Sequence, residues 1–271
     1  MDNILKQIDI LTDFIHKNPL NPRLEQSLEE NFKLHYTYDS NAIEGNTLTL
    51  METKVVLEGI TIGGKTLKEH IEVINHAEAI NFIEDLVKNK EPLSEYQIKS
   101  IHHLILKAID DKNAGVYRNT EVYISGARHI LPSYIHVPIE MDSFMKWYQN
   151  ESVKLHPVIR ASRIHINFVG IHPFIDGNGR TSRLLMNLEL LKAKLPSINI
   201  KSDRKAQYYE ALDKAHCDKH FDDFDRLVAD YVLQRLEEKK ELILKENQKS
   251  SQNLNYLSYQ TQIHTHLRIK R

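Results

Sequence analysis

Helical spacing of apolar residues runs through most of the chain and constrains its fold more than any other feature. Apolar side chains recur three and four residues apart, which is the period of one face of an α-helix. Strands do not alternate with these segments, so the sequence does not predict a parallel sheet with crossover helices. We therefore expect an all-α fold. The expected helices cover residues 2–17, 23–44, 49–58, 66–88, 94–109, 140–150, 157–171, 179–194, 203–216 and 221–247.

Capping residues mark several of the expected helix ends. Thr49 and Glu52 have the spacing of a capping box, which predicts a short helix that ends before Gly59. Ser94 has a side chain suited to the N-cap of the helix that follows it. Gly45 stands where a left-handed residue would end the second helix.

One segment departs from helical character: VYRNTEVYISGARHILPSYIHV, residues 116–137. It is rich in Val, Ile and Tyr and is punctuated by Ser-Gly and Leu-Pro pairs, which predicts a β-hairpin. Gly126 lies near the expected turn, and Pro132 is expected off the central ladder because it has no N–H. The tail from Ser250 has little periodicity, and we expect it to be loosely held.

Composition and charge exclude several classes of protein. Hydrophobic residues make up 41% of the 271 residues, enough for a sizeable core. The net charge of −1 gives no electrostatic footprint for nucleic acid or an anionic membrane. The sequence has no run of about 18 apolar residues that could span a bilayer, and residues 1–18 read as an amphipathic helix rather than a signal peptide. Cys217 is the only cysteine, which suits a reducing compartment, so we expect a cytoplasmic protein.

GITIGGKT, residues 59–66, matches the phosphate-binding pattern GxxxxGK(S/T) at every position. A working P-loop follows a buried strand, whereas the segment before this match reads as a helix. We interpret the match as a turn between helices, in which Gly63 and Gly64 allow tight backbone geometry and Thr66 is the N-cap. The alternative is a P-loop ATPase in which Lys65 binds phosphate.

A second glycine-bearing stretch, IHPFIDGNGRTSRLLMN at residues 171–187, has the context that the first one lacks. An apolar helix leads into a turn, and a new helix begins near Gly179. Gly177, Asn178 and Gly179 therefore lie at a helix N-terminus, where free N–H groups and the helix dipole favour an anion.

Four charged or titratable side chains adjoin this turn. Arg180 and Arg183 are three residues apart on the new helix, so both can fork onto phosphate oxygens. Asp176 is a hard oxygen ligand suited to Mg²⁺. His172 ends the preceding helix and is a natural general base near neutral pH. Together these residues predict phosphoryl or nucleotidyl transfer.

HPFIDGNGRTSR at residues 172–183 resembles the motif of the Fic family, HPFx(D/E)GNGRxxR, at every fixed position. The resemblance extends over roughly residues 30–235. It implies a Fic-type helical domain and, as its usual reaction, transfer of AMP from ATP to a hydroxyl of a target protein with release of pyrophosphate. Gly179 also favours nucleotidyl transfer, because family members that transfer a terminal phosphate carry lysine there.

By position, the resemblance implies the role of each residue of the motif. His172 would deprotonate the target hydroxyl, and Asp176 would hold Mg²⁺ on ATP. The implied nucleotide-binding residues of the motif are Gly177, Asn178, Gly179, Arg180, Thr181, Ser182 and Arg183.

Two further segments find a role through the resemblance. The hairpin, residues 116–138, resembles the family's flap, which holds the target's extended backbone by β-augmentation. Val122 and Ile124 would border the nucleotide. Tyr208 and Tyr209 mark the segment that flanks adenine.

Some relatives place an asparagine seven residues after the second tyrosine, where this chain has His216. We expect the other histidines, His102, His103, His129 and His136, to be packing or surface residues, because a single cysteine leaves no zinc-ligand spacing with cysteines.

SNAIEG, residues 40–45, resembles the family's inhibitory motif (S/T)xxxE(G/N). Ser40 and Glu44 share a helix face because they are four residues apart. The resemblance implies that Glu44 pairs with Arg183, removes a partner of the γ-phosphate and leaves ATP in a pose unfit for in-line attack.

The expected organisation has three parts: residues 1–110 with the inhibitory helix near 36–45, the Fic core at 111–235, and the C-terminal helix end and tail at 236–271. We expect ATP and a target protein as partners, and the resemblance also allows a homodimer. Two alternatives to a self-inhibited adenylyltransferase remain beside the P-loop ATPase. One is removal of AMP from a modified target by a water that Glu44 positions, and the other is a helical module that senses nucleotide without chemistry.

Overall fold

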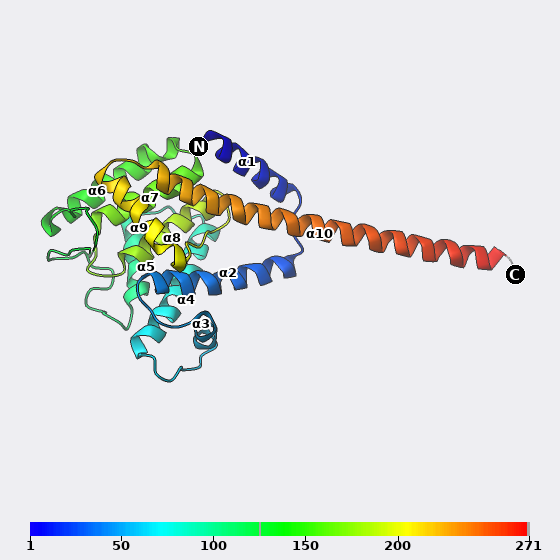
Figure 1. Cartoon of the computed structure of the whole chain (residues 1–271), viewed down its shortest axis with the longest axis horizontal. Helices are drawn as coiled ribbons and strands as arrows, with labels where there is room; N and C mark the ends of the chain where they lie inside the picture. Colours follow the sequence, from blue (N-terminus) through cyan, green and yellow to red (C-terminus); the bar gives the residue numbers. More distant parts are fainter. Residues whose placement is uncertain (125, 270–271) are drawn as a thin grey trace.

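The computed structural model describes residues 1–124 and 126–269, and within these ranges it is helical without any strand, so the expected all-α fold is confirmed (Figure 1). The helices are α1 (Asp2–Lys17), α2 (Pro22–Ile43), α3 (Leu50–Leu57), α4 (Leu67–Lys88), α5 (Glu95–Leu106), α6 (Val137–Asn150), α7 (Pro157–Ile171), α8 (Asn178–Lys192), α9 (Lys205–Cys217) and α10 (Asp222–Ile269). Short 3₁₀ turns cover Tyr134–His136, Ser152–Lys154 and Ser202–Arg204.

Helix α8 lies at the centre of the fold. It is buried around its whole circumference, as expected for a helix that other helices surround. Met186 and Leu190 belong to a core shared with α1, α7, α9 and α10, whereas Leu184 and Leu188 belong to a second core shared with α4, α5 and α6. Both cores therefore fix the position of the α8 N-terminus, where the sequence predicts the anion site.

The first and last helices of the chain pack against each other. Helix α1 packs along α10, and α10 projects beyond the rest of the helices (Figure 1). We expected this last helix to end near residue 247, but it continues to Ile269. The proposed division of the chain into three parts stays a prediction.

The GITIGGKT stretch is a turn between α3 and α4, as we interpreted it. Thr66 forms a capping box with Glu69 at the start of α4. The Nζ atom of Lys65 donates to the backbone oxygen of Thr47 at 2.6 Å and lies 3.7 Å from a carboxylate oxygen of Glu52. Lys65 therefore connects the turn between α3 and α4 to the turn between α2 and α3. The other expected capping box, Thr49 with Glu52, is also present.

One helix start and one helix end differ from expectation. The Ser94 side chain makes no capping bond to the α5 backbone. Helix α5 ends at Leu106 rather than near residue 109, because Lys107 is extended (ψ 130°) and Ala108 is left-handed (φ 58°).

The β-hairpin expected over residues 116–137 is wrong for the part that the structure describes, because that part contains no strand. Residues 116–124 and 126–133 form a loop with a turn at Gly126 (φ 81°), and the segment ends in the 3₁₀ turn Tyr134–His136 and the first residue of α6. The two arms of the loop are joined at their base by the side chain of Arg118, which donates to the backbone oxygens of Thr120 and Pro132. A buried guanidinium therefore holds the arms together at a point where the sequence pattern predicted a backbone ladder. We keep the name flap for residues 116–133.

Candidate functional site

The loop between α7 and α8, residues 172–177, forms the floor of the site. His172 ends α7 in the left-handed region (φ 52°), and Gly177 begins α8 in the same region (φ 75°). The side-chain amide of Asn178 closes the loop, because it accepts from the Phe174 N–H at 3.0 Å and donates to the Phe174 oxygen at 2.9 Å. The Asn178 side chain is therefore occupied within the loop.

His172 is prepared to accept a proton. Burial lowers its pKa to about 4, so the imidazole is neutral at pH 7. Its Nδ1 atom lies 3.4 Å from the backbone oxygen of Val169, which can only accept a hydrogen bond. Nδ1 therefore carries the proton, and the lone pair is on Nε2. A neutral imidazole with a free Nε2 is the form that a general base requires.

Asp176 is the carboxylate of the loop, and its side chain is 53% exposed. One oxygen accepts from the Gly177 N–H at 2.6 Å and lies 3.6 Å from Arg180. The described residues contain no cluster of three His, Cys, Asp or Glu side chains that could enclose a metal. A single accessible carboxylate fits Mg²⁺, which keeps several waters and is otherwise bound by substrate phosphates.

His102 supports this loop from α5. Its Nδ1 accepts from the Gly115 N–H at 2.9 Å, so Nε2 carries the proton and donates to the Asp176 backbone oxygen at 2.8 Å. The ring also stacks on Phe174, with centroids 3.5 Å apart and planes within 2°. We expected His102 to be a packing residue, but both of its nitrogens hold backbone groups around the candidate metal ligand.

Arg183 meets the segment that resembles the inhibitory motif. Its Nη2 lies 2.8 Å from a carboxylate oxygen of Glu44 and 2.9 Å from the Ser40 backbone oxygen, and its Nε donates to the Ser40 hydroxyl at 3.0 Å. Arg183 is 1% exposed and the Glu44 side chain 29%. A charge-assisted pair at this depth is screened little by solvent.

Arg180 is buried beside the same helix end. Its Nη1 lies 3.4 Å from a carboxylate oxygen of Glu72, outside hydrogen-bonding geometry, and its Nε also has no acceptor among the described residues. Buried donors without acceptors are uncommon and mark sites that a ligand or water completes. Arg180 therefore has free donors next to Asp176.

A cavity of about 610 Å³ opens above the α8 N-terminus. Its lining includes, among the predicted site residues, Glu44, Ile124, His172, Gly179, Arg183, Tyr208 and Tyr209. Tyr208 is buried, whereas Tyr209 is 42% exposed.

Six predicted nucleotide-binding residues lie outside the lining of this cavity: Val122, Gly177, Asn178, Arg180, Thr181 and Ser182. Val122 is half-buried, two residues before Ile124. The side chains of Thr181 and Ser182 are fully buried, and the Ser182 hydroxyl is 3.0 Å from Nε2 of His165. The Thr181 N–H already donates to the Gly177 oxygen at 2.9 Å.

The sequence did not indicate that His129 and His216 would meet. Both line the cavity, and their rings stack with centroids 4.4 Å apart. Each ring also bonds to an α7 carbonyl at 2.9 Å, His129 to Gly170 and His216 to Ile166. This stack joins the flap to α9 across α7. No local pattern could have revealed it, because the two residues are far apart in the sequence.

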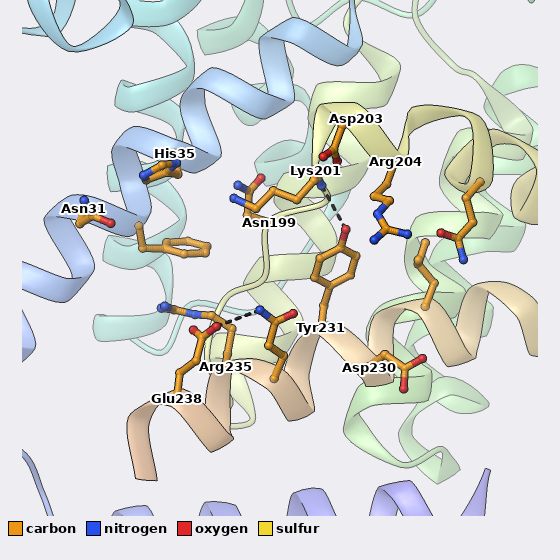
Figure 2. Close-up of a pocket in the computed structure, with 14 residues that line it drawn as sticks. Asn31, His35, Asn199, Lys201, Asp203, Arg204, Asp230, Tyr231, Arg235 and Glu238 are labelled. Carbon is orange, nitrogen blue, oxygen red and sulfur yellow. Dashed lines mark hydrogen bonds between the residues drawn. The ribbon is translucent and has the colours of Figure 1, made fainter. Parts of the chain in front are cut away.

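A second cleft, of about 560 Å³, lies between α2 and α10, and none of the predicted site residues lines it (Figure 2). The 199–207 segment and α10 form its other walls, and the Lys201 N–H donates to the Tyr231 hydroxyl at 3.2 Å. Asn199 extends from this segment to Asp39, which also accepts two bonds from Ser202. Because Asp39 directly precedes Ser40, this segment anchors the end of α2 that carries Glu44.

Comparison with known proteins places the site in a family. The Fic/DOC family model matches residues 92–190. The protein adenylyltransferase Fic of Drosophila grimshawi is 38% identical over 198 residues, which are 72% of this chain and 40% of that protein. The protein adenylyltransferase Fic of Nematostella vectensis is 36% identical over 196 residues, 71% of this chain and 45% of that protein. The chain thus spans less than half the length of these curated relatives.

Solved structures agree with this assignment over most of the chain. The Fic-1 protein of C. elegans has a TM-score of 0.81 and 30% identity, covering 90% of this chain and 73% of that one. A Fic domain containing signaling protein from Bacteroides thetaiotaomicron has a TM-score of 0.79 and 30% identity, covering 89% and 98%. With its motif loop, its central α8 and its flap in this arrangement, the chain belongs to the Fic/DOC family.

Proposed function

We propose that the protein transfers AMP from ATP to a hydroxyl of a target protein and that Glu44 inhibits the transfer. One observation carries the proposal: neutral His172 and buried Arg183 line the same cavity at the α8 N-terminus. The first supplies a base, and the second supplies charge for phosphate oxygens. The names of the Drosophila and Nematostella relatives support adenylyl transfer as the reaction.

The proposed step is a displacement at the α-phosphorus of ATP. His172 Nε2 removes the proton of the target hydroxyl, whose oxygen forms a bond to the α-phosphorus while the bond to the β-phosphate oxygen breaks. Pyrophosphate leaves with that electron pair, and the target retains AMP. The backbone at Gly177 and Gly179 and the guanidinium groups of Arg180 and Arg183 hold the phosphates. Asp176 would hold Mg²⁺, which supplies positive charge to the phosphate oxygens.

Inhibition rests on the contact between Glu44 and Arg183. While the pair exists, Arg183 cannot direct its donors at a γ-phosphate, and the carboxylate repels the nucleotide's own charge. Displacing the phosphates from their in-line position by about 1 Å can reduce the rate about a hundredfold. Glu44 would therefore control the rate without contacting the reacting hydroxyl.

The test is transfer from ATP labelled at the α-phosphate, with self-labelling as the readout. We expect Glu44→Gly to increase labelling, and Glu44→Gly combined with His172→Ala to abolish it while the circular dichroism spectrum stays unchanged. Mass spectrometry should show an added AMP. Label that enters only from the γ-phosphate would show phosphoryl transfer instead, and no increase with Glu44→Gly would remove the inhibitory role.

Removal of AMP from a modified target is the second candidate. It is favoured by the position of Glu44, whose carboxylate lines the cavity together with His172 and could orient a water. An AMP-modified target incubated with the wild type and with Glu44→Gly separates the two functions. Loss of AMP with the wild type and not with the variant supports removal. A nucleotide sensor without chemistry would neither transfer AMP nor remove it.

The flap is the proposed docking site of the target. Tyr123 and Ile130 are 92% and 89% exposed on its two arms, and the absence of a ladder in its described part leaves backbone groups that an extended segment could pair with.

Within the described residues, no helix is both long enough and apolar enough to cross a bilayer. We further propose a cytoplasmic location, which suits the free Cys217, and a homodimer that light scattering would detect.

A further inference from the structure

Arg118 is buried beside the catalytic loop, yet it does not line the cavity. Its side chain is 0% exposed. Two other buried arginines near the site each lie next to a carboxylate. Arg180 lies next to Glu72 of α4, and Arg183 lies next to Glu44, which follows α2. The carboxylate nearest to Arg118 is Glu121, which is 46% exposed and 3.5 Å away. A buried guanidinium with so little charge compensation must satisfy its N–H groups in another way.

Backbone oxygens from three places satisfy it. Nε donates to the oxygen of His172 at 2.9 Å, Nη1 donates to the oxygen of Thr120 at 3.2 Å, and Nη2 donates to the oxygen of Pro132. The Arg118 backbone N–H also donates to the oxygen of Pro173 at 2.9 Å. Arg118 thus holds the outgoing arm of the flap, the returning arm and the loop that begins at the proposed base.

The contact with His172 has a further effect. His172 is not glycine, and the left-handed backbone that it adopts (φ 52°, ψ 58°) costs energy unless its surroundings hold it there. The Arg118 bonds to two successive carbonyls, those of His172 and Pro173, supply that constraint. Arg118 therefore contributes both to the direction of the imidazole and to the position of the flap.

We propose that Arg118 is a positioning residue that fixes the target-docking flap relative to the general base. The expected effect on catalysis rests on the proposed function. The link between the flap and residues 172–177 can be tested without measuring activity. Arg118 contacts neither the nucleotide cavity nor the reacting atoms. It acts through the backbone of residues 120, 132, 172 and 173.

The experiment compares two arginine substitutions by hydrogen–deuterium exchange. Arg118→Met keeps an unbranched stem and removes every donor. Arg128→Met is the matched control, because Arg128 is 58% exposed and ties only the returning arm to Asp213 and Asp218 of the α9 end. We expect Arg118→Met to accelerate exchange about tenfold in both the flap and residues 172–177, and Arg128→Met to accelerate it in the flap alone.

Activity gives the second readout, in the Glu44→Gly background. Arg118→Met should reduce self-labelling about a hundredfold while calorimetry shows ATP affinity within about twofold of the parent, and Arg118→Lys, which keeps one donor group, should recover part of the rate. Exchange that rises only in the flap, or in neither segment, overturns the link. Loss of ATP binding would show instead that Arg118 maintains the fold. If the Glu44→Gly parent transfers nothing although both segments are protected, the proposed function fails and the link stands.

Discussion

The carboxylate of Glu44 occupies the space into which residue 179 would project a side chain. A Cβ placed on Gly179 would lie 2.2 Å from Oε1 of Glu44, far inside van der Waals contact. The Glu44 carboxylate and the glycine at the start of α8 are therefore fitted to each other.

The first prediction concerns this fit. Gly179→Ala should destabilise the protein by about 1–3 kcal/mol, because the methyl group displaces Glu44 from Arg183. In a Glu44→Ala background the same substitution should have a much smaller effect, so thermal unfolding of the four proteins gives a coupling energy. Gly63→Ala is the control, because a Cβ at residue 63 meets nothing within 4 Å. Equal effects of Gly179→Ala in both backgrounds would contradict the fit.

The second prediction concerns pH. Burial lowers the pKa of His172 and that of His102 to about 4, below the usual 6.5. Between these values the unfolded chain binds more protons than the native protein, so stability should fall as the pH drops from about 6.5 towards 4. Melting temperatures measured across this range should decline, and His102→Gln should decline less steeply. A slope that this variant leaves unchanged would mean that His102 is not protected from protons in the native state.

The third prediction tests the role of His102 in holding Asp176. His102→Phe keeps a ring that can stack on Phe174 but loses both hydrogen bonds, whereas His102→Gln can keep a donor and an acceptor. We expect the Phe variant to need about tenfold more Mg²⁺ to reach half-maximal ATP binding, and the Gln variant to lie near the wild type. Calorimetric ATP titrations at several Mg²⁺ concentrations measure this. His103→Phe serves as the neighbouring control, and equal Mg²⁺ requirements of all four proteins would remove the role.

The fourth prediction concerns the P-loop pattern. Lys65→Ala should leave ATP affinity unchanged, because Lys65 bonds to Thr47 and lies near Glu52. It should lower the melting temperature slightly, since the side chain is part of the turn between α3 and α4. Arg183→Ala, tested beside it by calorimetry in the Glu44→Gly background where the arginine is unpaired, should lose affinity relative to Glu44→Gly alone. A large loss with Lys65→Ala would restore the nucleotide role of GITIGGKT.

Local sequence rules predicted most of the helical architecture because they act over a few residues. Thr49 and Thr66 predicted the starts of α3 and α4, because their side chains cap the helices that follow them. The same rules failed at the flap, where strand-like composition predicted a ladder. The arms are held instead by Arg118, whose bond to Pro132 joins residues 14 apart and whose bond to His172 joins residues 54 apart.

In the candidate site, too, contacts between residues close in the sequence could be predicted and contacts between distant residues could not. The motif from His172 to Arg183 is local, so its turn, its helix N-terminus and its base could be read directly. His102 reaches the Asp176 carbonyl across 74 residues, and nothing near it in the sequence indicates that contact. The pairing of Glu44 with Arg183 joins residues 139 apart, and it was anticipated only because SNAIEG resembles a known motif.

The location of both residues on one chain has a consequence for how the proposed inhibition could be relieved. Because Glu44 and Arg183 belong to the same folded molecule, the local concentration of the carboxylate is set by the fold and does not change when the protein is diluted. Dilution alone cannot separate the pair. A change in the position of the α2 end, which Asn199 and Ser202 hold through Asp39, would alter how often Arg183 is free.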